Sequence, residues 1–355
     1  MNIIQRKSNF EFLRIICMIF IIWGHLINKF FVQSSIVELN YLESLFFKSF
    51  TIVAVNVFVL ISGYFSISFK LSRLLKLVQE TWFYSIFLFI LATYMEWHHF
   101  ILQKDILYLC PIFSKIYWFI TIYVILYILS PCLNKLALSI SKNHFKSILL
   151  TGFFIIYIWH TLSFILNSNR PIDDAGFGIP NFIYLYLLGR YIKLYNISFH
   201  SKKFFLLLYF IISISLCLFQ LSYSIILGFS FTALFSYNTI FVFLGSVTLF
   251  LFFTKLNIGY NSFINKWAKY CLAIYIIHMH PLLWYKICEF LQITHIPPIW
   301  FIPYSLSVSI IMYFTFALVE KIRLYFFDNI ENKINNRIMQ TKIAQKIESK
   351  IKLSA

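Results

Sequence analysis

Apolar stretches of about 20 residues recur along nearly the whole chain, separated by short segments that contain charged residues, Asn, Gly or Pro. A helix of that length, rising about 1.5 Å per residue, crosses the roughly 30 Å hydrocarbon core of a bilayer. The pattern therefore predicts an all-α fold, a polytopic integral membrane bundle of about ten transmembrane helices. The predicted spans cover residues 10 to 32, 44 to 67, 77 to 95, 116 to 138, 146 to 166, 180 to 196, 203 to 221, 237 to 254, 267 to 288 and 299 to 320.

Basic residues are divided unevenly between the connections of these spans. With the N-terminus inside, 23 Lys and Arg residues fall on the inner side and 6 on the outer side. Excess Lys and Arg in short loops marks the cytoplasmic side of a membrane protein. We therefore expect a multi-pass protein of the cell inner (plasma) membrane with both termini in the cytoplasm.

Composition excludes a soluble globular protein, because 60% of the 355 residues are hydrophobic, 21% are aromatic and mean hydropathy is +0.79. The net charge of +17 comes from short loops and a tail. This distribution favours anionic membrane lipids, and not nucleic acid, as the charged partner. The six cysteines form no CxxC pair, so neither a disulfide framework nor a metal site is predicted.

The chain divides into an integral membrane domain, residues 1–320, and a basic tail, residues 321–355. In the tail, isoleucines recur at steps of four or five between Lys, Arg, Gln and Asn, at positions 334, 338, 343, 347 and 351. This pattern is typical of an amphipathic helix on the inner membrane surface. A frayed, solvated tail is the alternative.

The first predicted span carries three ionisable residues, Glu11, Arg14 and His25. Eleven steps of about 100° bring Arg14 and His25 to one helix face, about 16 Å apart. Glu11 lies three residues before Arg14, where the two side chains can pair. Ionisable residues within a membrane span usually mark a functional site. The alternative is a His25 bonded to a backbone carbonyl and an Arg14 that reaches the headgroups.

Charged residues after the second span and in one outer loop offer further candidates. Arg73 and Lys76 lie three apart at the inner surface, where they can hold phosphates or serve as topological anchors. Asp173 and Asp174, in a turn-rich loop, are interpreted as a solvated loop end in preference to a catalytic carboxylate pair.

Two motifs within the spans carry polar or small residues. The Ser62-Gly63 pair fits a close-packing or bending site. His278 and His280 cannot share one helix face, so they do not form a metal pair, and at least one is expected to be structural.

In order and wording, several blocks resemble the type 3 membrane acyltransferases, which O-acylate bacterial surface polysaccharides and related glycans. The blocks are RKSNFEFLRI, FVLISGYF, YWFITIY with the LSP downstream, YLLGRYI and IYIIHMHPL. The resemblance extends over essentially the whole span region. It implies functional roles for Arg14 and His25. Where the family often has Arg-x-x-Arg, this chain has Arg73-Leu74-Leu75-Lys76, which keeps the charge but loses one guanidinium.

The resemblance implies an O-acetyltransferase that moves an acyl group, expected to be acetyl, from cytosolic acyl-CoA to a hydroxyl of a cell-surface or lipid-linked glycan. In this hypothesis Arg14, Arg73 and Lys76 bind the donor acetyl-CoA, Glu11 orients Arg14, and His25 acts as general base or transient acyl carrier. No metal is required. The alternatives are an exporter or flippase of a glycan or lipid-linked sugar, and a structural subunit of an envelope complex. The sequence leaves open whether the chain forms a homo-oligomer.

Overall fold

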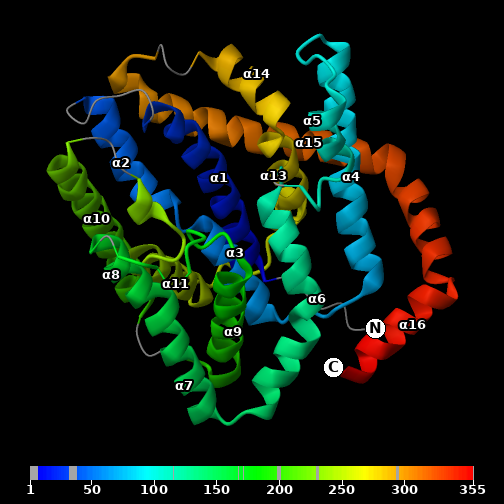
Figure 1. Ribbon diagram of the computed structural model, residues 1–355, viewed down its shortest axis with the longest axis horizontal. Helices are drawn as coiled ribbons and strands as arrows, with labels where there is room; N and C mark the ends of the chain where they lie inside the picture. The colour runs from blue at the N-terminus through cyan, green and yellow to red at the C-terminus, as the bar shows by residue number, and fades with distance from the viewer. Residues whose placement is uncertain are drawn as a thin grey trace. The chain divides into compact units, whose positions relative to one another are not determined.

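The computed structural model describes residues 7–31, 38–114, 116–166, 168–170, 172–197, 201–228, 232–292 and 296–354 (Figure 1). Arg6, the first residue of the RKSNFEFLRI block, lies outside these ranges. Every regular element within them is helical, which confirms the predicted all-α membrane bundle. The α-helices are α1 (Ser8–Phe31), α2 (Leu39–Thr51), α3 (Ala54–Phe65), α4 (Leu71–Tyr94), α5 (Leu102–Leu109), α6 (Trp118–Ser139), α7 (Lys142–Phe153), α8 (His160–Ile165), α9 (Ile179–Tyr195), α10 (Lys202–Leu227), α11 (Ile240–Thr254), α12 (Ser262–Trp267), α13 (Cys271–Met279), α14 (Pro281–Leu291), α15 (Pro298–Met339) and α16 (Lys342–Ser354).

Each of the ten predicted spans coincides with one or more of these helices. Within the described residues, eight helical segments are long and apolar enough to cross a membrane, and α12 to α14 make a ninth if their bent pair counts as one span. That pair bends by 80° between Met279 and Pro281. The remaining predicted span is α9, whose 17 residues extend only about 26 Å at the helix rise, less than a typical hydrocarbon core.

The chain forms two compact units. The first comprises Met1–Phe65, Ile140–Lys269 and Ile293–Ile311, and the second comprises Ser66–Ser139, Tyr270–Gln292 and Met312–Ala355. In the first unit α3 packs against α1, α9 and α11. In the second unit α4 packs against α5, α13 and α14, and α16 packs against α6.

Two glycines let α3 and α9 touch backbone to backbone. A methyl group built on Gly63 would overlap the carbonyl of Tyr186, and one on Gly189 would lie 2.5 Å from the carbonyl oxygen of Leu60. Small residues allow this close approach of helices in membranes. The close-packing interpretation of the Ser62-Gly63 pair is therefore confirmed, and the glycine of YLLGRYI has the matching role.

A buried ion cluster joins two helices of the second unit. The guanidinium of Arg323 on α15 donates hydrogen bonds of 2.7 and 2.8 Å to the carboxylate of Glu320 and a further one to Glu331. Tyr84 on α4 donates to the same Glu320 carboxylate at 2.7 Å, and Phe83 lies under the guanidinium at 5.3 Å. Arg323, which the charge pattern assigns to the inner basic tail, is only 5% exposed. Its charge pairs with carboxylates inside this unit.

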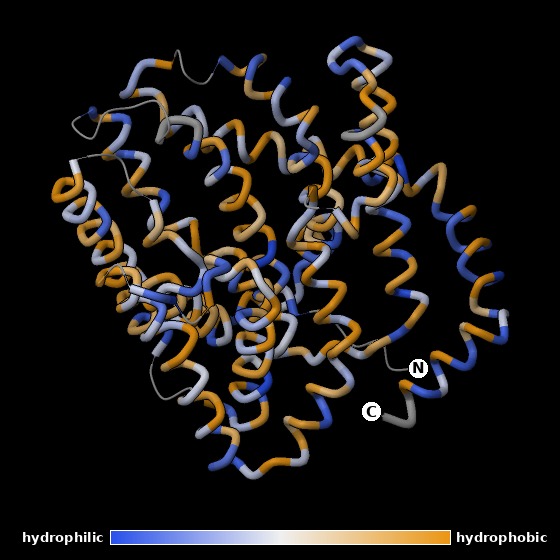
Figure 2. The backbone as a smooth tube through the Cα atoms, viewed as in Figure 1, coloured by the Kyte–Doolittle hydropathy of each residue, from blue (hydrophilic) through white to orange (hydrophobic). Residues whose placement is uncertain are grey.

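The C-terminal segment is helical. Helix α15 continues through residue 320 to Met339, and α16 follows after a short turn. Along α16 hydrophobic and hydrophilic positions alternate (Figure 2), and Ile343 and Ile347 are exposed. The structure thus has the amphipathic helix, while its contact with the inner membrane surface stays a prediction, as does the domain boundary at residue 320.

Candidate active site

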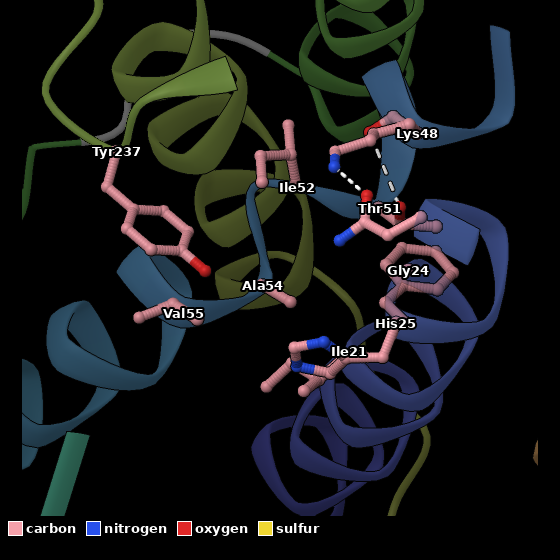
Figure 3. Close-up of a pocket in the computed structure, with 11 residues that line it drawn as sticks. Ile21, Gly24, His25, Lys48, Thr51, Ile52, Ala54, Val55 and Tyr237 are labelled. Atoms are coloured by element: carbon pink, nitrogen blue, oxygen red, sulfur yellow. Dashed lines mark hydrogen bonds between the residues drawn. The ribbon is translucent and has the colours of Figure 1, made fainter. Parts of the chain in front are cut away.

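A pocket of about 50 Å³ lies in the first unit, where α1 passes the junction of α2 and α3 (Figure 3). The junction occurs at the β-branched run Thr51, Ile52 and Val53. Such residues have lowered helix propensity. In addition, the Thr51 hydroxyl donates to the Lys48 carbonyl at 3.3 Å, a local bond that competes with the helical ladder. The recess lies where the helix is interrupted.

His25 lines this pocket from α1. Its side chain is half-buried, and Figure 3 shows its imidazole pointing into the pocket from the side opposite the Tyr237 ring. Thus the structure places His25 at a recess of the protein that Asn28, Lys48, Thr51 and Tyr237 also line. A histidine in this position can take a proton from, or give one to, a group held in the pocket.

Lys48 on α2 lines the same pocket and is only 8% exposed. Its ammonium group donates a hydrogen bond to the side-chain oxygen of Asn28 on α1 and lies 5.3 Å from the ring centroid of Phe235. Lys48 was not among the predicted site residues, because its sequence position places it near the outer end of a predicted span. The signal was present, since a lysine within an apolar helix is an intramembrane ionisable group.

A chain of buried asparagines fixes Tyr237, the wall of the pocket opposite His25. Asn56 on α3 donates to the backbone carbonyl of Tyr237 at 2.8 Å, and Asn181 on α9 donates to the Asn56 side-chain oxygen at 3.3 Å. Tyr157 in turn donates to Asn181 at 2.7 Å. Buried polar networks of this kind rigidify their surroundings when satisfied. Asn56 lies two residues before the FVLISGYF motif, on the same helix.

The two carboxylates of the outer loop have structural partners. Asp173, whose side chain is 70% exposed, pairs with Arg170 at 2.7 Å. Asp174 accepts the backbone N–H of Gly176 at 2.8 Å, and the carbonyl of the neighbouring Ala175 accepts the N–H of Tyr237. These contacts shape the loop that holds Tyr237, and they fit the interpretation of the pair as a loop end.

Glu11 and Arg14 form the ion pair that their spacing predicts, with 3.8 Å between Arg14 Nη1 and Glu11 Oε1. The Glu11 side chain is 10% exposed and that of Arg14 is 34% exposed. Neither lines the pocket, because Arg14 lies about 16 Å from His25 along α1. The pair therefore occupies the far end of the same helix.

Arg73 and Lys76 are exposed at the start of α4, in the second unit. Lys76 forms an exposed ion pair of 3.7 Å with Asp328 on α15. The structure therefore gives Lys76 a partner within its own unit. The predicted role of Arg73 and Lys76 in donor binding stays a prediction.

His278 and His280 both contact backbone carbonyls. The His278 ring donates to Ile274 at 2.7 Å, and the His280 ring donates to Ser85 at 3.3 Å and stacks on Tyr108. Both contacts fit the structural role expected for at least one of them. Across the described part of the chain no cluster of His, Cys, Asp and Glu could hold a metal ion.

Residues 7–293 match a family described as an acyltransferase domain. The chain belongs to this acyltransferase family. The predicted resemblance is thereby confirmed, and the match includes every residue that lines the pocket as well as Glu11, Arg14, Arg73 and Lys76. It ends before α15. Comparisons with curated proteins and with solved structures give no match.

Proposed function

We propose that the protein is a membrane-embedded O-acyltransferase that moves an acetyl group from cytosolic acetyl-CoA to a hydroxyl of a cell-surface or lipid-linked glycan. One observation carries the proposal: in a chain of the acyltransferase family, the intramembrane His25 points into a pocket of the first unit that Lys48 also lines. A histidine there is suited to move the proton of an acyl acceptor.

The chemistry requires a base, because a sugar hydroxyl is a poor nucleophile near neutral pH. Histidine has an ordinary pKa near 6.5 and is the usual general base in that range. In the proposed reaction the hydroxyl oxygen attacks the thioester carbon while His25 accepts the hydroxyl proton. The carbon–sulfur bond then breaks, and the proton passes to the CoA thiolate. Transient transfer of the acyl group to His25 itself is the alternative route.

The size of the pocket favours a small acyl group. A volume of about 50 Å³ has room for roughly three or four water-sized groups. An acetyl group is of this size, whereas a fatty acyl chain is much larger. We therefore propose acetyl-CoA as the donor.

For the donor's polar part we propose three basic residues. Arg14, oriented by Glu11, would contact acetyl-CoA at the inner end of α1, and Arg73 and Lys76 would contact its phosphates at the start of α4. Arginine forms bidentate bonds with phosphate, and lysine acts as a point charge. Lys76 would have to exchange Asp328 for this contact.

The exporter alternative has one structural feature in its favour, the broken span at His280. Transporters built from inverted repeats carry such breaks at corresponding positions of two halves. Within the described residues one helix pair bends by more than 40° in this way. The presence of one such break among those residues, in place of a matching pair, together with membership of the acyltransferase family, supports the acyltransferase over the exporter.

The decisive experiment compares cells that express wild-type protein, His25→Ala or His144→Ala. His144 is an exposed histidine on α7 of the same unit and serves as the matched control. We expect mass spectrometry of the surface glycan to show complete loss of O-acetylation with His25→Ala, normal acetylation with His144→Ala, and equal protein levels. Persistent acetylation with His25→Ala would contradict the mechanism. Loss of the glycan itself from the surface would point to the exporter.

A further inference from the structure

Lys48 is a lysine buried in a membrane span, and two neighbouring residues contact its amino group. It lies in the third turn of α2, within the segment Leu39–Phe65 that can cross a membrane. An ionisable group at such a site is costly and usually functional. The side-chain oxygen of Asn28 and the face of Phe235 both stabilise a cation. The fold thus holds the amino group of Lys48 inside the first unit.

That charge faces the place where the reaction is proposed to occur. Lys48 reaches the pocket from α2 and His25 reaches it from α1 (Figure 3). The pocket is small, so a group that occupies it lies near both side chains. A base and a cation on one small cavity are the two elements that an acyl transfer needs, one for the proton and one for the developing negative charge.

We propose that Lys48 is a further catalytic residue, which donates a hydrogen bond to the carbonyl oxygen of the acyl group and stabilises the oxyanion of the tetrahedral intermediate. This inference rests on the proposed function. When the acceptor oxygen bonds to the carbonyl carbon, the electron pair of the C=O bond moves to the oxygen. Lys48 keeps its proton and lowers the energy of that charge. When the carbonyl re-forms, the carbon–sulfur bond breaks, and the sulfur takes the proton held by His25.

A purely structural role of residue 48 would not require a positive charge. The bond to Asn28 ties α2 to α1, but a neutral donor such as glutamine would serve the same purpose without a buried charge. The two roles therefore differ in what they require at position 48. Catalysis requires the positive charge, whereas the link between α2 and α1 requires only a hydrogen-bond donor.

The test is steady-state kinetics of purified full-length protein in lipid vesicles, with acetyl-CoA as donor and de-O-acetylated surface glycan from the source cells as acceptor. The variants are Lys48→Gln, Lys48→Met, Lys48→Arg and His25→Ala. Lys142→Met is the matched control, because Lys142 is an exposed lysine whose ammonium lies 5.4 Å from the Tyr195 ring. Thermal unfolding of each variant measures the folded fraction.

We expect Lys48→Gln and Lys48→Met to lower kcat by about 10² to 10³, as loss of an oxyanion donor does, with KM for acetyl-CoA nearly unchanged. Lys48→Arg should retain much more activity than either, and Lys142→Met should match the wild type. Wild-type kcat in folded Lys48→Gln would overturn the proposal, and so would equal losses in the Gln and Arg variants. If Lys48→Met does not fold, the Gln and Arg variants decide.

His25→Ala separates this proposal from the one on which it rests. An inactive His25→Ala beside a fully active Lys48→Gln would overturn only the role of Lys48. A fully active His25→Ala would overturn the proposed mechanism itself, whatever Lys48→Gln does.

Discussion

The Asn56 side chain donates a 2.8 Å hydrogen bond to the backbone carbonyl of Tyr237, 181 residues further along the chain. This bond joins the first turns of α3 to the segment that precedes α11, and it sets the wall of the pocket that faces His25. A residue that touches no reacting group thereby fixes the geometry of the candidate site.

We predict that Asn56→Ala lowers both activity and stability. It removes the Asn56 donor to the Tyr237 carbonyl and one of two acceptors of the Asn181 amide, which also donates to the Gly176 carbonyl, at a cost of about 1–3 kcal/mol. Displacement of Tyr237 should lower kcat by about tenfold or more. Asn134→Ala is the matched control, because Asn134 also donates to a partly buried backbone carbonyl, that of Ile67, but in the second unit. Equal effects of the two variants on kcat would contradict the positioning role.

Gly63→Ala should disrupt folding of the first unit. Its new methyl group would overlap the Tyr186 backbone on α9, and backbone cannot move aside as a side chain can. Overpacking of this kind typically costs 1–3 kcal/mol or more. For comparison, a methyl group at Gly245 would meet the Val53 side chain at 3.1 Å, so Gly245→Ala should be milder. The midpoint temperature of thermal unfolding in detergent measures the stability of both variants. A wild-type midpoint for Gly63→Ala would contradict the close contact between α3 and α9 at Gly63.

Arg323→Met should be among the most destabilising changes in the second unit. It leaves the buried carboxylate of Glu320 without its cation, and breaking a buried pair from one side costs about 3–5 kcal/mol. Arg170→Met removes an exposed pair and should cost about 1 kcal/mol or less. Denaturant titration of the two variants should show this contrast, and equal losses would argue against the cluster's contribution.

Arg73→Ala and Lys76→Ala should raise KM for acetyl-CoA several-fold, with smaller effects on kcat, if these residues bind the donor. Asp328→Asn is the control for Lys76, because it breaks the same ion pair but keeps the lysine. Loss of that exposed pair should cost at most about 1 kcal/mol. A rise in KM with Asp328→Asn as large as with Lys76→Ala would assign Lys76 to structure instead of to donor binding.

The charge bias predicts that both termini lie in the cytoplasm. A reporter that fluoresces only in the cytoplasm, fused after Ala355, should therefore be active, and a reporter enzyme that requires the outer side should be silent there. The opposite pattern would contradict the predicted cytoplasmic location of the C-terminus.

Local relationships could be read from the sequence, and long-range ones could not. The Glu11–Arg14 pair and the placement of His25 on a membrane helix follow from spacing along one helix. Lys48 was misjudged because the second span was predicted to begin at residue 44, whereas α2 begins at Leu39 and places Lys48 well inside the helix. Tyr237 joins the pocket only through the fold, since no periodicity relates it to His25.

Side-chain contacts also explain why the C-terminal region differs from the prediction. The span pattern ended at residue 320 because charged residues begin there. In the structure α15 continues, and the guanidinium of Arg323 donates hydrogen bonds to both Glu320 and Glu331. A single sequence shows these charged residues but not that Arg323 pairs with both carboxylates.

The glycine seam between α3 and α9 restricts how the first unit can move. Two helices whose main chains are in direct contact act as one rigid plate, because any sliding would drive Gly63 or Gly189 out of the only register without a clash. Access of a substrate to the recess beside His25 is therefore not expected to involve sliding of α3 along α9.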